Sequence, residues 1–115
     1  CNLFMEHFMK DGLYIAEFRT PLDEAAGVIV ITDGQIRGGD SGMYYRGALT
    51  EKNGDIEVKM TVRRHNPAAQ SVFGDFEAFD LSLKGRAKDG HYAFEGRADA
   101  APGLRFEATL RPAED

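Results

Sequence analysis

The stretch MYYRGALTEKNGDIEVKMTVRR, residues 43–64, contains two strand-like segments joined by a two-residue turn, and it decides the fold class. Along 56–64, apolar residues occupy every second position and polar residues lie between them. This period of two is typical of a β-strand with one buried face. Asn53-Gly54 tolerates the positive φ angles of a type I′ turn, so it can join this strand to another predicted over 43–50. The stretch therefore predicts an antiparallel hairpin.

Similar strand-like segments occur on both sides of this hairpin. Further strands are predicted over 12–19, 27–32, 79–86, 92–98 and 104–111. No segment shows a convincing helical period. Seven or eight short antiparallel strands in chain order predict an all-β fold, an up-and-down antiparallel barrel that closes or nearly closes on itself.

The turn residues agree with this topology. Asp33-Gly34 and Asp89-Gly90 repeat the hairpin signal of Asn53-Gly54, and Pro102-Gly103 predicts one more turn. Residues 65–71 form a longer predicted connection, in which proline blocks strand pairing. Neighbouring strands should thus be antiparallel throughout.

The glycines between 35 and 60 raise the question of a phosphate-binding loop. Such a loop needs a following Lys, a Ser or Thr and a helix, and none of these follows Gly38 or Gly39. We therefore interpret Gly38-Gly39-Asp40 as a corner between strands. Gly47 is expected at a bulge or sharp bend within its strand.

Length and composition indicate one folded domain. The chain has 115 residues, of which 43% are hydrophobic and 29% are charged, with no composition shift that would mark a linker. We expect a β-barrel domain over 9–115 and an N-terminal extension or cloning-derived segment over 1–8, with Met9 as the natural start. Cys1 would also fit a processed lipoprotein, but the residues after it lack a polar tether.

The charge and cysteine content exclude several classes of function. The net charge of −5 disfavours direct binding to nucleic acid. The densest basic spot, Arg63-Arg64, should form no patch because adjacent strand residues point to opposite faces. No apolar run reaches the ~18 residues of a membrane span. A single cysteine excludes an intramolecular disulfide and fits a cytoplasmic location.

No group of residues in the sequence predicts catalysis. The three histidines stand in separate segments without a metal-ligand spacing, and no serine lies in a nucleophile-elbow context. We therefore expect no metal, no cofactor and no enzymatic activity.

The aromatic content is the strongest chemical signal, with eight Phe and four Tyr but no Trp. Six of these residues fall on predicted inward positions: Tyr14, Phe18, Phe79, Tyr92, Phe94 and Phe106. They could line a cavity for a small apolar ligand, as a barrel of this size permits. Aromatic residues also fill barrel cores, so the interior is either packed or hollow.

The segment GVIVIT at 27–32 is apolar on both faces. A strand of this kind is usually covered on both sides. The cover could be a second copy of the chain or the N-terminal segment.

Four segments together resemble the GrlR-type family, whose founding member is a negative regulator of type III secretion. They are MKDGLYIAEF, GVIVITDGQIRGGD, YYRGALTE and VRRHN…SVFG, within residues 9 to 75. The Met-Lys-Asp-Gly start and the Gly-Gly-Asp of residues 38–40 are the most specific parts. The resemblance implies a lipocalin-like barrel, a homodimer, and regulation through protein–protein contact.

The family resemblance also implies a partner and a contact. In the founding member an acidic loop contributes to capture of a helix-turn-helix transcription activator. The matching loop here is Glu51-Lys52-Asn53-Gly54-Asp55, which keeps an acid at each end only. Our first hypothesis is therefore a regulator that sequesters a transcription activator. The alternative is a carrier or sensor of a small apolar ligand inside the barrel.

Overall fold

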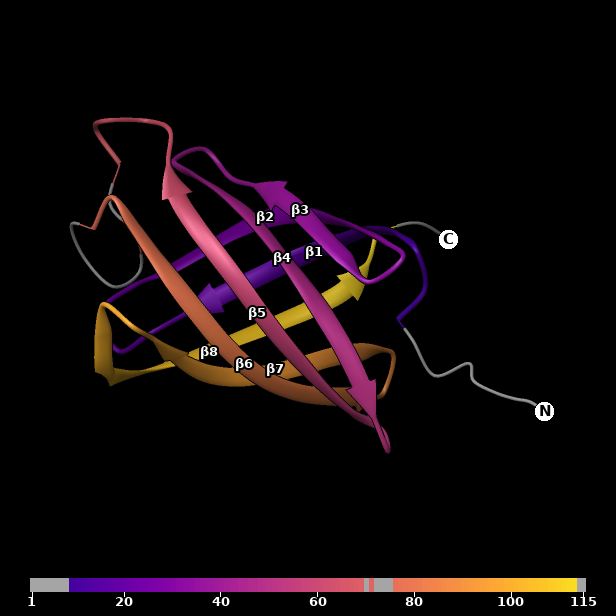
Figure 1. The fold of residues 1–115 in the computed structure, drawn as a ribbon. Helices are drawn as coiled ribbons and strands as arrows, with labels where there is room; N and C mark the ends of the chain where they lie inside the picture. Colours follow the sequence, from indigo (N-terminus) through magenta and orange to yellow (C-terminus); the bar gives the residue numbers. More distant parts are fainter. Residues whose placement is uncertain (1–8, 70, 72–75, 114–115) are drawn as a thin grey trace.

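The architecture is a closed β-barrel (Figure 1), seen in a computed structural model that describes residues 9–69, 71 and 76–113. The predicted extension over 1–8 lies outside the described residues. The strands are β1 (Gly12–Arg19), β2 (Glu24–Thr32), β3 (Gln35–Gly39), β4 (Met43–Lys52), β5 (Asp55–Arg64), β6 (Ala78–Lys88), β7 (His91–Ala98) and β8 (Ala101–Pro112). The described residues contain no helix that could cross a membrane.

Every strand pairs antiparallel with the next one in the chain, and β8 pairs with β1 to close the sheet. The closing register runs from Tyr14 opposite Pro112 to Arg19 opposite Glu107. The predicted all-β, up-and-down antiparallel barrel is therefore confirmed, with eight strands in the described part of the chain. Closure removes the free strand edges through which sheets otherwise pair with other chains.

The three Asx-Gly turns have the predicted conformation. Asp33, Asn53 and Asp89 have φ angles of 53°, 56° and 49°, and the glycine after each is also at positive φ. These tight turns lie at one end of the barrel, which we call the turn end (Figure 1). The longer connections 20–23 and 40–42 lie at the other end, the loop end, together with the described residues between β5 and β6, which are 65–69, 71, 76 and 77.

The prediction of a turn at Pro102-Gly103 is wrong. Both residues lie inside β8, and the chain reverses at residues 99–100, where Ala98 pairs with Ala101. The pairing of β7 with β8 shifts register between Gly96 and Ala98, next to this turn. A proline is tolerated at such an irregularity because its backbone, which has no N–H group, need not donate a hydrogen bond to the neighbouring strand there.

The predicted corners at the glycines are also wrong. Gly38 and Gly39 belong to β3, a strand whose position was not predicted, and Gly47 lies in an unbroken register opposite Met60. A Cβ atom on Gly38 would lie 2.1 Å from a backbone oxygen of β2, and one on Gly47 would lie 2.3 Å from the backbone oxygen of Lys59. These glycines therefore allow strands to approach closely and do not turn the chain.

The barrel interior is apolar along every strand, and the alternation predicted for 56–64 is confirmed. The β2 side chains Ile29 and Ile31 are at most 1% exposed and point inward. Val28 and Val30 point outward and are 47% and 45% exposed. Within the described chain, β2 thus has one buried face and one apolar face on the surface.

Candidate functional site

A cavity of about 330 Å³ opens at the loop end of the barrel. This volume is at the lower end of the range for small-molecule sites, about 300–1,000 Å³. Its wall includes Phe18, Tyr45, Met60, Phe79, Leu81 and Phe106. Three of the six predicted cavity residues, Phe18, Phe79 and Phe106, therefore line one shared space.

The aromatic rings of this cavity are held in fixed contacts. Phe18 stacks on Phe106 with 5.8 Å between ring centroids, and meets the edge of Tyr45 at 5.3 Å. Offset and edge-to-face aromatic pairs of this kind add to the stability gained from burial. This aromatic part of the cavity wall is thus preformed by residues on β1, β4 and β8.

Asp40, predicted as part of a family-marker turn, organises the mouth of the cavity. One carboxylate oxygen accepts hydrogen bonds from the backbone N–H groups of Gly42 and Met43, each at 2.8 Å. The other oxygen accepts a short hydrogen bond from the Tyr45 hydroxyl. Burial and this hydrogen bond raise the pKa of Tyr45, so the phenol stays a neutral donor.

The connection after β5 is hydrogen-bonded to the loop at residues 40–42. The backbone N–H of His65 donates to the carbonyl of Gly42 at 2.9 Å, and a His65 ring nitrogen lies 2.9 Å from the carbonyl oxygen of Asp40. Ser71, 6% exposed, lines the cavity from the same connection. Two loops distant in sequence therefore form one side of the mouth.

The other predicted cavity residues lie away from this space. Tyr14 and Tyr92 form an edge contact, with 6.2 Å between ring centroids, and the Tyr14 hydroxyl donates to the carbonyl of Lys10 at 2.7 Å. Burial and the neighbouring Tyr92 raise the pKa of Tyr14. Phe94 is 5% exposed, and it packs beside Gly85 in the core.

The predicted partner loop, Glu51 to Asp55, forms the tip of the β4–β5 hairpin at the turn end. Residues Lys52, Asn53, Gly54 and Asp55 are exposed. Glu51 continues the inward positions of β4 after Leu49, and its charge contributes to the raised pKa of Tyr14.

The second acid of this hairpin also has a local partner. Asp55 forms an ion pair with Arg86 on β6. The two acids of the hairpin therefore point in different directions, so the tip presents Lys52 and Asn53 rather than a block of negative charge.

The outer surface of β1 and β2 carries an apolar patch that we call the outer apolar face, formed by Leu13, Ile15, Val28 and Val30. Leu13 lies opposite Val30 and Ile15 lies opposite Val28, so the four side chains form two adjacent cross-strand pairs. The β2 half of this face is visible in the apolar segment 27–32, whereas the pairing with β1 is shown only by the strand register.

Among the described residues, no three His, Cys, Asp or Glu side chains come together in a way that could hold a metal ion.

Comparison with known families extends the resemblance along the chain. Residues 9–107 match the family model described as GrlR, T3SS negative regulator. The match runs from before β1 into β8 and includes most of the chain. No curated protein sequence gives a significant match.

Proposed function

The chain belongs to the GrlR family of type III secretion negative regulators, and from this membership we propose that it regulates by binding other proteins and not by catalysis. The observation that carries the proposal is the outer apolar face. Its two cross-strand pairs form a contiguous apolar patch in which Val28 and Val30 are nearly half exposed, and contiguous patches of this kind often mark protein–protein interaction sites. A cytoplasmic location is part of the same proposal.

The outer apolar face supports a homodimer. In a two-fold dimer the same patch meets itself, so Leu13, Ile15, Val28 and Val30 of each copy would be covered together. The dimer would supply the cover expected for the apolar strand β2.

The proposed partner of the regulator is a helix-turn-helix transcription activator, and its proposed contact is the β4–β5 hairpin tip. Because Glu51 points inward and Asp55 pairs with Arg86, recognition at this tip relies on the exposed polar groups of Lys52 and Asn53. A regulator bound to the DNA-reading region of an activator keeps it from DNA, which is how sequestration would repress transcription.

A hairpin variant tests this contact. We expect Lys52→Ala to weaken capture of the activator in a pull-down and to relieve repression of a type III secretion promoter reporter. Lys88→Ala is the matched control, because Lys88 occupies the equivalent position before the Asp89-Gly90 turn. Equal repression by both variants and the unchanged protein would exclude the hairpin as the contact.

The cavity at the loop end favours a second candidate function, the carriage or sensing of a small apolar ligand. Its aromatic wall and its volume of about 330 Å³ fit a compact apolar molecule. Native mass spectrometry should then detect a co-purifying small molecule. The cavity-filling variant Ala25→Leu should reduce its occupancy, and an empty unmodified protein argues against this candidate.

A further inference from the structure

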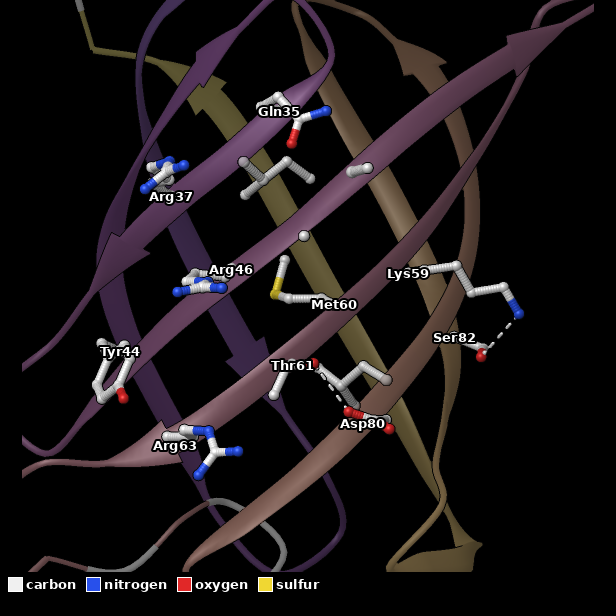
Figure 2. A pocket seen from close by; sticks show the side chains of 14 residues that line it. Gln35, Arg37, Tyr44, Arg46, Lys59, Met60, Thr61, Arg63, Asp80 and Ser82 are labelled. Carbon is white, nitrogen blue, oxygen red and sulfur yellow. Dashed lines mark hydrogen bonds between the residues drawn. The ribbon is translucent and has the colours of Figure 1, made fainter.

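A groove of about 840 Å³ runs along the outer surface of β3, β4, β5 and β6. Figure 2 shows that its polar side chains lie on the outer face of the sheet, whereas Met60, also labelled there, is buried in the barrel interior. Ala48 leaves the middle of the groove low, because its outward side chain is only a methyl group. We call it the cationic groove, after Arg37, Arg46, Lys59 and Arg63 on its rim.

The strand register brings these cations together. Arg37 on β3 lies directly opposite Arg46 on β4, and Arg63 on β5 lies opposite Tyr44 on β4. Residues directly opposite on neighbouring strands have Cβ atoms about 4.5–5.5 Å apart, and like charges in that position are destabilising. The sequence predicted that Arg63 and Arg64 would form no basic patch, because neighbours along a strand point to opposite faces. The basic patch of the groove forms instead between residues on adjacent strands.

None of the four groove cations forms an ion pair within the part of the chain that the structure describes. Lys59 donates to the Ser82 hydroxyl at 3.3 Å, whereas Asp80 accepts a hydrogen bond from Thr61 at 2.9 Å (Figure 2). Elsewhere on the outer surface four cations are matched with acids: Arg19 with Glu107, Lys84 with Glu57, Arg86 with Asp55 and Arg105 with Glu95. The groove is thus a local excess of positive charge in a chain of net charge −5.

We propose that the cationic groove binds an acidic, extended segment of a partner protein. Arginine presents a planar fork of donors that matches a carboxylate, and Arg37 and Arg46 offer two forks side by side. Tyr44 supplies an aromatic surface beside them, and the Gln35 amide can bond to a peptide backbone. This inference goes beyond the proposed function, since neither the outer apolar face nor the hairpin tip forms the groove.

The charge balance favours a protein segment over nucleic acid. The groove offers four cations and includes the carboxylate of Asp80. Proteins that bind duplex DNA commonly neutralise about 6–10 phosphates. A short acidic peptide needs fewer cationic contacts than duplex DNA. Its carboxylates can bind over β3 and β4, away from the negative charge of Asp80 on β6.

Fluorescence anisotropy with a labelled peptide of alternating Glu and Gly tests the proposal on the full chain. We expect binding to the unmodified protein and no binding of the corresponding Gln-Gly peptide. Arg37→Gln with Arg46→Gln should weaken binding by about tenfold or more, because two charge-assisted contacts are lost. The control Lys88→Gln with Arg97→Gln changes the net charge equally at exposed positions outside the groove, and it should bind like the unmodified protein.

The variants should fold, because the substituted side chains are exposed and removing Arg37 and Arg46 relieves like-charge repulsion. Urea unfolding should show unchanged or slightly higher stability. Three results would overturn the proposal: no peptide binding by the unmodified protein, equal weakening in the control, or tighter binding of a single-stranded oligothymidylate than of the acidic peptide.

Discussion

Replacing the valines of the outer apolar face by threonine tests the proposed dimer. Val28 and Val30 are 47% and 45% exposed, so Val28→Thr with Val30→Thr removes little from the core of one chain. Threonine is β-branched and keeps the preference of valine for strands. We expect the free energy of unfolding of the monomer to change by no more than about 0.5 kcal/mol.

The dimer should respond far more strongly than the monomer. Each hydroxyl buried at the interface without a partner costs about 1–3 kcal/mol. A two-fold interface contains each substituted position twice, so even the lower value gives roughly 4 kcal/mol for both copies of Val28 and Val30. That free energy raises the dissociation constant of the dimer by roughly a thousandfold.

Sedimentation equilibrium measures this dissociation constant directly, and urea unfolding measured in parallel reports whether the chain still folds. Leu22→Thr is the control, because Leu22 is 61% exposed but lies in the connection after β1, outside the outer apolar face. We expect the control to dimerise like the unmodified protein. An unmodified protein that is monomeric, or a valine double variant that dimerises equally well, refutes the assignment of this face.

Three further predictions concern the barrel itself. Gly38→Ala should destabilise the fold by about 1–3 kcal/mol in urea unfolding, because the new Cβ would lie 2.1 Å from a backbone oxygen of β2. Tyr45→Phe removes the hydrogen bond to Asp40 and should cost about 1.5–3 kcal/mol in the same measurement; an unchanged midpoint would contradict that role. The hydrogen bond from Arg19 lowers the pKa of Glu107, so its stabilising effect is present above the unfolded pKa and is lost as pH falls through the folded pKa. Glu107→Gln should therefore flatten the acid side of the stability profile, and an unchanged profile would show that the pair contributes nothing.

Much of the barrel was predictable because local signals and global topology agree. The alternation over 56–64 sets the buried face of β5, and three Asx-Gly pairs have the positive φ angles that hairpins require. The same local rules failed where a residue acts through a neighbouring strand. Gly38 and Gly39 were interpreted as a corner, but their conformation is extended and their role is close packing, Gly38 against β2 and Gly39 against β4.

The candidate sites were less predictable, because they depend on cross-strand register. Phe18 and Phe94 both occupy inward positions, yet only Phe18 lines the loop-end cavity. The two residues differ in their position along the barrel axis, which the alternation within a single strand does not give. The inward direction of Glu51 was available from the sequence, because it lies two residues after Leu49 on the same strand. The pairing of Arg37 with Arg46 needed the structure, since no pattern in either strand shows the other.

Competition with DNA tests the central claim most directly. A fluorescent promoter fragment bound by the helix-turn-helix activator of type III secretion genes is titrated with the unmodified chain while anisotropy is recorded. Regulation by protein binding predicts that the chain releases the DNA at stoichiometric amounts and does not bind the fragment by itself. An activator that stays on DNA in the presence of excess chain, or direct binding of the chain to the fragment, would contradict it.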